Sequence, residues 1–265
     1  MEKFPIDHDL HCHTALSACA HDDGLTAAYI VDNARRNGYA TVAITDHFWD
    51  RKAAGASDWY APQDLSHVRG SLPLPDGGDT QVIFGCETEF CGGKKIGITP
   101  ENYNYFGMIV VPVNHFHMDG FSRPADCVTP AQVAELLVTR LEELCLLPLP
   151  WRRVGIPHLN GCSFPSEDGY MEAMMLADEN RLRAAFMCLS KAGAGIELNA
   201  FSFPTGWREN ETALLRLMRL AKEEGCRFYC CSDAHARGDL KLVGERLREV
   251  ADVLSLTAGD LFTPE

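Results

Sequence analysis

Residues 9–14 read Asp-Leu-His-Cys-His-Thr and close a strand-like run that covers residues 4–11. Side chains two positions apart along a strand point to the same side, so Asp9, His11 and His13 can face one interior together. The pair Asp233 and His235 repeats this spacing after the last strand-like run. We therefore expect the two ends of the chain to bring polar side chains to a common site.

Between these two segments, strand-like runs alternate with helix-like stretches that carry capping signals. The strand-like runs are residues 4–11, 41–46, 81–87, 106–114, 153–158, 195–199 and 227–232, and the helix-like stretches are residues 129–147, 178–191, 210–224 and 239–254. This alternation is typical of a parallel α/β fold. No G-x-G-x-x-G or G-K-[ST] segment is present, which favours a closed barrel over a nucleotide-binding open sheet. We expect one domain over residues 1–265, with residues 48–80 forming a functional loop at one end of the barrel.

The charge balance disfavours one class of partner. The 265 residues include 24 Lys and Arg against 37 Asp and Glu, a formal net charge of −13. Proteins that bind a nucleic-acid backbone usually present a basic face, and no Lys/Arg cluster occurs here. We therefore expect a small anionic substrate, held locally by metal, and not a nucleic acid; the sequence does not indicate the oligomeric state.

Cysteine usage and the apolar pattern indicate a cytoplasmic location. The eleven cysteines include no C-x-x-C pair, so a zinc ribbon or a thioredoxin-type redox site is not expected. The N-terminal residues lack the apolar core of a secretion signal. No run approaches the ~20 apolar residues that a membrane helix needs. We expect free thiols in a reducing cytosol, and no membrane partner.

Most histidines lie where a predicted strand ends, together with several carboxylates. The histidines are His11, His13, His47, His115, His117, His158 and His235, and the carboxylates are Asp9, Asp46, Glu87 and Asp233. In β/α barrels the side chains at the carboxyl ends of the strands converge on the ligand. A single histidine here would be unremarkable in a core, but so many imidazoles and carboxylates together need compensation, and divalent cations supply it.

Four segments resemble the signature blocks of the polymerase and histidinol phosphatase (PHP) superfamily, in the family's order. They are residues 9–14 (DLHCHT), 44–47 (ITDH), 85–89 (GCETE) and 232–235 (SDAH). Residues 156–158 (IPH) are similar to a further histidine block, and residues 197–199 (ELN) resemble the family's E-[IL]-N strand. Each block alone is weak evidence, whereas four in order are highly specific.

The resemblance implies a distorted, TIM-barrel-like (β/α)7 fold with three divalent ions, usually zinc, manganese or iron. Carried over position by position, it assigns His11, His13, Glu87 and Asp233 to the first metal, Glu87, His115 and His158 to the second, and His47 and His235 to the third. It also implies hydrolysis of a phosphoric ester by a metal-activated hydroxide.

Two positions depart from the family pattern. Cys19 stands where relatives often have His or Asp as a ligand of the third metal, and a thiolate suits zinc. His21 or Asp22 could take that place instead. His115 and His117 compete for the second metal, and the distance from the strand favours His115, which leaves His117 to orient the substrate or a ligand.

Several neighbouring residues have two interpretations each. Asp9 and Asp46 either orient ligand histidines or cap strand ends. Substrate contacts are expected from Asn199, Arg208 and Arg237, although arginines are more often simply solvated. The aromatic residues Phe201, Phe203 and Trp207 either pack against the leaving group or belong to the local core.

Four functions are consistent with these residues. A phosphoesterase acting on small phosphomonoesters or nucleotides is the leading one, followed by a histidinol-phosphate phosphatase. A nuclease or proofreading module is disfavoured by the acidity of the chain. A non-catalytic, metal-binding regulatory domain is disfavoured by the nearly complete ligand set.

Overall fold

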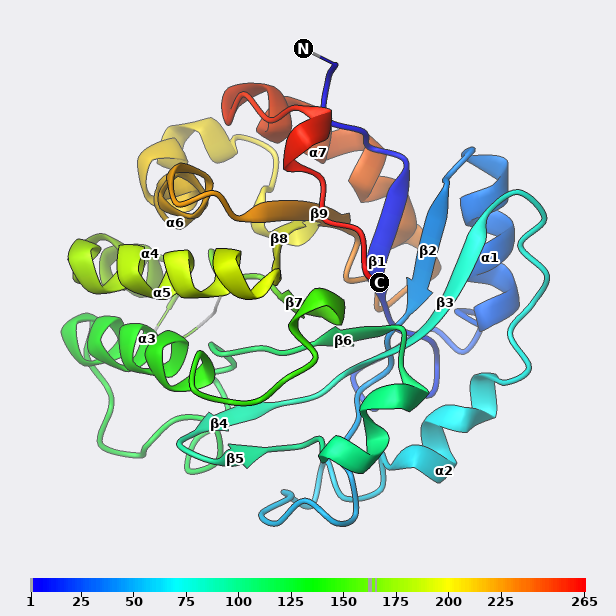
Figure 1. Ribbon diagram of the computed structural model, residues 1–265, viewed down its shortest axis with the longest axis horizontal. Coiled ribbons are helices and arrows are strands. Elements are labelled where there is room, and N and C mark those ends of the chain that lie inside the picture. Colours follow the sequence, from blue (N-terminus) through cyan, green and yellow to red (C-terminus); the bar gives the residue numbers. More distant parts are fainter. Residues whose placement is uncertain (1, 162–163, 165) are drawn as a thin grey trace.

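A computed structural model describes residues 2–161, 164 and 166–265. Seven parallel strands form one sheet that curls into a barrel, in the order β1-β2-β3-β6-β7-β8-β9 (Figure 1). The strands are β1 His8–Cys12, β2 Thr41–Ile44, β3 Gln81–Glu87, β6 Met108–Val110, β7 Val154–Ile156, β8 Gly195–Asn199 and β9 Arg227–Cys231. All seven lie within the strand-like runs of the sequence, apart from the last residue of β1. The predicted distorted (β/α)7 barrel is therefore confirmed.

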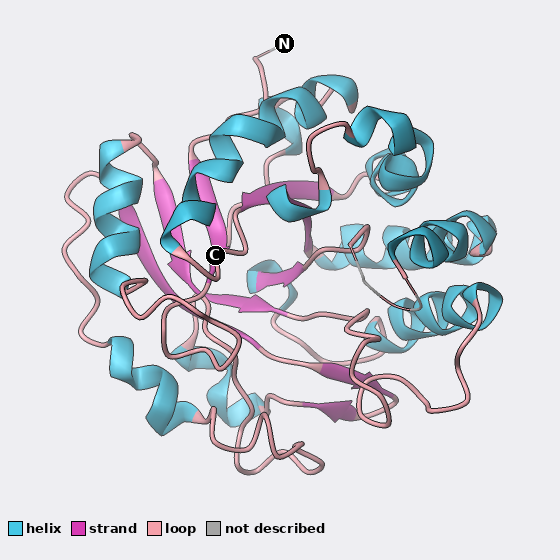
Figure 2. Cartoon of the chain, turned by 180° about the vertical axis from the view of Figure 1, so that it is seen from behind, coloured by secondary structure: helices cyan, strands magenta, loops and turns pink. Residues whose placement is uncertain are grey.

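Helices surround the strands on the outside of the barrel, and Figure 2 shows the same arrangement from behind. They are α1 Ala27–Arg36, α2 Leu65–Val68, α3 Pro130–Leu144, α4 Glu167–Leu176, α5 Glu179–Ala192, α6 Glu211–Glu223 and α7 Leu242–Val253. α3 begins with a capping box between Thr129 and Gln132, and α5 ends at Gly193 in the left-handed conformation. Thr129 is the first residue of the expected helix-like stretch 129–147, and Gly193 lies two residues beyond the expected stretch 178–191.

The barrel closes between its first and last strands through an irregular seam. At the top of the seam, Asp233 N donates to the carbonyl oxygen of His11 at 2.9 Å. Lower down, side chains replace the strand carbonyls: Cys230 N donates to His8 Nε2 at 2.8 Å, and Ser232 N donates to Asp9 Oδ1 at 2.9 Å. The register of β1 also shifts between Asp9 and Cys12. Asp9, which we expected to face inward with the histidines, therefore belongs to the seam.

The interior of the barrel is filled below the site. Leu10, Ala43, Met108, Val110 and Tyr229 form one buried cluster with Phe262 from the C-terminal segment. The ring of Phe262 lies so close to Gly195, the first residue of β8, that a Cβ there would be 2.6 Å from it. Phe262 thus packs at the amino ends of the strands, and polar side chains gather at the opposite end.

Some elements were not predicted from the sequence. α1, α4 and a short hairpin, β4 Phe90–Gly92 with β5 Lys95–Ile96, lie outside the expected ranges. Residues 48–80 form a long loop with only short helices, as expected, and Trp49 and Tyr60 anchor it in a small cluster with Cys91. No helix in the described part of the chain combines the length and the apolar composition that crossing a bilayer requires.

Candidate metal centre

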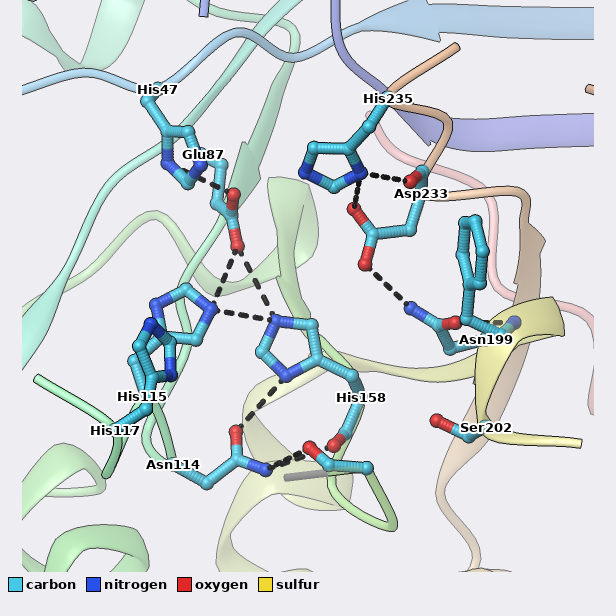
Figure 3. A pocket seen from close by; sticks show the side chains of 12 residues that line it. His47, Glu87, Asn114, His115, His117, His158, Asn199, Ser202, Asp233 and His235 are labelled. Atoms are coloured by element: carbon cyan, nitrogen blue, oxygen red, sulfur yellow. Dashed lines mark hydrogen bonds and ion pairs between the residues drawn. The ribbon is translucent and has the colours of Figure 1, made fainter. Parts of the chain in front are cut away.

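Glu87, the last residue of β3, lies at the centre of the polar end of the barrel and is only 1% exposed. Its Oε2 lies 3.1 Å from His47 Nδ1, 3.3 Å from His13 Nε2 and 3.5 Å from His11 Nε2. Its Oε1 faces the other way, 3.4 Å from His158 Nε2 and 3.7 Å from His115 Nε2. Every ion-pair partner found for Glu87 among the described residues is a histidine. One carboxylate therefore separates two sets of imidazoles. Figure 3 shows Glu87 between His47 on one side and His115 and His158 on the other.

Potential ligand atoms gather in groups in which all donors lie within 4.8 Å of one another. Three of these groups are His11, His13 and Asp233; Glu87, His115 and His158; and His13, Cys19, His47 and His235. Each group contains residues expected for one of the three metals. Glu87 is absent from the first group, and His13 occurs in the third group as well as in the first. Several buried His, Glu and Asp side chains are thus placed so that they could bind metal ions.

Glu197 on β8 fixes the ring of His11. Its Oε2 lies 2.8 Å from His11 Nδ1 and also accepts a hydrogen bond from the Tyr229 hydroxyl at 3.0 Å. Its Oε1 accepts from His158 N at 3.0 Å. This leaves His11 Nε2 turned toward Glu87 and Asp233, the orientation that a metal ligand needs.

The other rings are held in a similar way from behind. Glu89 Oε2 lies 2.6 Å from His115 Nδ1 and accepts from the Tyr60 hydroxyl. Asn114 Oδ1 lies 3.1 Å from His158 Nδ1. In each case the far nitrogen, Nε2, is left facing Glu87.

Asp46 is linked to the ring of His13 through the hydroxyl of Ser17. Ser17 Oγ lies 2.9 Å from His13 Nδ1 and donates to Asp46 Oδ1 at 2.7 Å. Asp46 also accepts from Thr14 N at 2.7 Å, so it caps the end of β1 at the same time. Asp46 therefore contacts both the end of β1 and, through Ser17, the ring of His13.

Cys19, His21 and Asp22, the three alternatives for one ligand of the third metal, have different surroundings. Cys19 is grouped with His47 and His235, whereas His21 is exposed and its backbone N–H donates to the His235 carbonyl oxygen. Asp22 accepts hydrogen bonds from Arg237 N and Nε. Of the three residues, Cys19 is therefore the one whose side chain lies among the possible ligands His13, His47 and His235.

His117 lies beside His115 at the cavity and is not in any of the ligand groups formed by the described residues. Their rings are 5.4 Å apart. Burial, with His115 and His158 nearby, lowers the pKa of His117 to about 4. The ring is therefore neutral at pH 7.

The charges at the centre are strongly coupled. Burial favours neutral His13, but hydrogen bonds to Asp233 and Glu87 raise its pKa to about 9. Burial disfavours the charge on Glu87, but His47 and His11 bring its pKa well below the usual range. Burial and the charges of Glu87 and Asp233 raise the pKa of the Cys19 thiol. Buried carboxylates that hold protons on neighbouring imidazoles form a donor set that divalent cations fit.

A cavity of about 280 Å³ opens above these side chains. Asn199 lines it and donates to Asp233 Oδ2 at 3.0 Å, whereas Arg208 and Arg237 are absent from its described lining. Arg208 pairs with Glu211 and Glu249, and Arg237 with Asp22. No Lys or Arg occurs among the described lining residues, so the structure does not bring the two expected arginines to the site.

Comparisons with known proteins bear on the fold. No family model matches the sequence, and no curated protein matches it. The histidinol phosphate phosphatase of Lactococcus lactis subsp. lactis, solved with zinc, L-histidinol and phosphate, superposes with a TM-score of 0.59 at 11% identity, over 97% of this chain and 98% of that one. A proposed histidinol phosphatase from Listeria monocytogenes gives 0.58 at 14% identity, over 88% and 96%.

The chain has the fold of these two proteins. The match covers almost all of both chains and confirms, at the level of the fold, the resemblance inferred from the sequence blocks. At 11% and 14% identity, this similarity establishes the fold and not the activity.

Sequence reasoning missed most of the residues that hold the ligand rings. Glu89 and Glu197 both stand in quoted blocks, but neither was assigned a role. Their signal was an acidic residue two positions from another site residue: Glu197 precedes Asn199 on β8, and Glu89 follows Glu87 just beyond the end of β3. Ser17, Tyr60 and Asn114 had no such signal, because loops bring them to the site.

Proposed function

We propose that the chain is a metal-dependent phosphoric ester hydrolase with three divalent ions, of zinc, manganese or iron. Glu87 is the observation that carries this proposal, because its two oxygens face separate sets of histidines, as a carboxylate shared by two cations would. The ligands are His11, His13, Glu87 and Asp233 for the first ion, Glu87, His115 and His158 for the second, and Cys19, His47 and His235 for the third.

The bound ions would lower the pKa of water and neutralise charge on the phosphoryl oxygens. The protein's own residues orient the reactants. Glu197, Glu89 and Ser17 fix the ligand rings from behind. The N–H of neutral His117 can donate one hydrogen bond to a phosphoryl oxygen. Asn199 donates a hydrogen bond to Asp233 and so holds its carboxylate in place.

The open cavity supports a catalytic role over a purely structural one. A structural metal site is usually closed by protein ligands, whereas a catalytic site keeps space for substrate. The cavity above Glu87, His115 and His158 leaves such a space. The described lining of the cavity contains no Lys or Arg, so the metal ions would have to neutralise the charge of the substrate's phosphate.

Histidinol-phosphate phosphatase is the second candidate. It is favoured by one observation: the two solved structures compared above, with TM-scores of 0.59 and 0.58, are described as a histidinol phosphate phosphatase and a proposed histidinol phosphatase. This is an argument from fold alone, and one fold hosts many activities.

A substrate screen on protein of measured metal content tests both candidates. The panel includes 4-nitrophenyl phosphate, histidinol phosphate, sugar phosphates and nucleoside monophosphates. We expect metal-dependent release of phosphate from several esters. Turnover of histidinol phosphate far above all the others would select the second candidate, and no hydrolysis of any ester would contradict the proposal.

A further inference from the structure

Tyr60 lies in the long loop after β2 and is buried at the polar end of the barrel, with 0% of its surface exposed. Its hydroxyl donates a hydrogen bond to Glu89 Oε2 at 3.1 Å and lies 3.4 Å from His47 Nδ1. His47 belongs to the third ligand group, and Glu89 holds the ring of His115, which belongs to the second. One hydroxyl therefore lies between the supports of two different ligand groups.

Both hydrogen bonds of Glu89 found among the described residues use the same oxygen. Oε2 lies 2.6 Å from His115 Nδ1 and accepts from Tyr60, whereas Oε1 is buried and has no partner in the described part of the chain. An ionised carboxylate only accepts hydrogen bonds, so the hydroxyl hydrogen of Tyr60 points to Glu89. The lone pairs of the Tyr60 oxygen are then free to accept from an N–H of His47.

The tautomers of the two histidines depend on this hydroxyl and on Glu89. An imidazole that binds a cation is neutral, so one ring nitrogen carries hydrogen and the other binds the cation. His47 Nδ1 has two acceptors nearby, Glu87 Oε2 at 3.1 Å and the Tyr60 oxygen at 3.4 Å. When Glu87 binds ions, Tyr60 is the acceptor left for this N–H. A hydrogen on Nδ1 leaves Nε2 as the ligand atom of His47, and Glu89 has the same effect on His115.

Aromatic packing leaves the Tyr60 hydroxyl little freedom to move. The centroid of its ring lies 4.7 Å from that of Trp59, 5.5 Å from that of Trp49 and 5.7 Å from that of Phe121. The Phe121 ring is stacked on it. A side chain packed on several sides keeps its polar atom in one position, as a residue that orients metal ligands must.

The loop that carries this tyrosine contacts the third ligand group at two more places. The ring of Trp59 lies edge-on to that of His47, with their centroids 4.9 Å apart. Gln63 Oε1 accepts a hydrogen bond from Ala18 N at 2.9 Å, directly beside Cys19 in the chain. The loop after β2 therefore packs along the third group, and the tyrosine hydroxyl extends this packing to the second group.

We propose that Tyr60 is a positioning residue shared by the second and third metal sites, and that both ions need its hydroxyl to bind at full affinity. This inference rests on the proposed metal-dependent function and gives the loop after β2 a role in it. The first ion should not depend on this hydroxyl, because Glu197 and Ser17 orient the rings of its histidines. Loss of the hydroxyl should therefore weaken the binding of two ions out of three.

Cobalt(II) titration of Tyr60→Phe tests this proposal, because the change removes the hydroxyl and keeps the ring. Cys19 is the only thiol among the residues assigned to the three ions, so a cobalt–thiolate charge-transfer absorption reports the third ion alone. Elemental analysis at each free cobalt concentration counts all three. We expect the midpoint of the absorption to move to roughly tenfold or more free cobalt, as is typical when a partner of a metal ligand is lost. The content curve should show a second ion weakened to a similar degree and one ion unchanged.

Tyr103→Phe makes the same change on a partly buried tyrosine outside the ligand groups, and it should leave both curves unchanged. An absorption curve of Tyr60→Phe that matches the wild type would overturn the proposal. Weakening of the third ion alone would also overturn it, because Tyr60 would then serve one site.

Glu89→Gln tests the same hydrogen-bonded chain at its other end. It should weaken the second ion and leave the absorption curve in place, because glutamine still offers an oxygen to Tyr60. Glu172→Gln, the same change on an exposed residue of α4, is its control. Adding Tyr60→Phe to Glu89→Gln should shift the absorption curve but weaken the second ion little further. Fully additive losses at the second ion would contradict a role of Tyr60 that acts through Glu89.

Hydrolysis measured on the same preparations separates this inference from the proposed function. Wild-type protein that holds three ions but hydrolyses no ester would refute the function, and the titrations would still decide the role of Tyr60. Active enzyme whose Tyr60→Phe variant binds cobalt as the wild type does would refute the role of Tyr60 and leave the function intact.

Discussion

At the scale of single residues, Glu87 and the histidines around it determine what the site can do. Glu87 to glutamine keeps the size of the side chain but removes the charge that would be shared by two ions. We expect kcat to fall by at least about 100-fold, because the ligand set loses its central anion. The circular dichroism spectrum should not change. Phosphate release from 4-nitrophenyl phosphate measures the loss, with Glu172→Gln as the control, and near wild-type turnover would refute the bridging role.

Cys19 allows a second test at the same scale. Replacing Cys19 with serine exchanges a thiolate for a weak neutral ligand, so elemental analysis should find one metal ion fewer per chain. Cys19→His and Cys19→Asp should retain that ion at least in part, because both supply good ligands. His21→Ala should be nearly silent, since His21 is exposed. Unchanged stoichiometry in Cys19→Ser, with a loss in His21→Ala, would reverse the assignment.

At the scale of elements, the seam between β1 and β9 depends on a side chain in place of a strand carbonyl. Asp9 to alanine leaves the buried Ser232 N–H without its acceptor, which costs about 1–3 kcal/mol of unfolding free energy. Asp9 to asparagine keeps an oxygen at that position and should cost clearly less. Denaturant unfolding of the two variants measures the difference. Equal losses would mean that Asp9 acts through its charge and not through the seam.

The same seam shows where prediction from the sequence stops. The strands were predictable because each is a short apolar run between turn signals, and the ligands because they stand at strand ends. The direction in which Asp9 points was not, because a register shift in β1 breaks the two-residue alternation. Arg208 and Arg237 could not be placed either, because each pairs with an acidic side chain from a distant part of the sequence, Glu249 and Asp22.

α1 and α4 were not predicted from the sequence because their local patterns are weak. Their apolar faces are short, and α4 follows a segment rich in proline and serine that obscures its start. Glu89 and Tyr60 come together only because the long loop after β2 folds back over the barrel end. Contacts of this kind depend on tertiary structure, and no local pattern encodes them.

At the scale of the whole molecule, metal binding and stability should be linked through pH. In the metal-free protein the pKa of His13 is raised to about 9, against burial, by Asp233 and Glu87, and that of His115 to about 9, against burial, by Glu89. These folded-state values lie above the usual 6.5, so the protonated rings stabilise the fold below pH 6.5. That stabilisation is lost as the pH rises through about 9.

Metal binding has the opposite pH dependence, because the cations need neutral imidazole. We therefore expect the Tm of metal-free protein to fall between pH 6.5 and 9, while the increase in Tm on adding zinc grows over the same range. Thermal melts with and without zinc at three pH values measure both trends. A zinc-induced increase that shrinks with rising pH would contradict the ligand assignment.

The measurement that tests the central claim most directly is metal content together with activity, on one preparation purified without chelator. The account predicts more than one divalent ion per chain, with three at full occupancy. It also predicts that phosphatase activity disappears when the ions are stripped and returns when zinc, manganese or iron is restored. Protein free of metal that hydrolyses phosphoric esters at the full rate would contradict it.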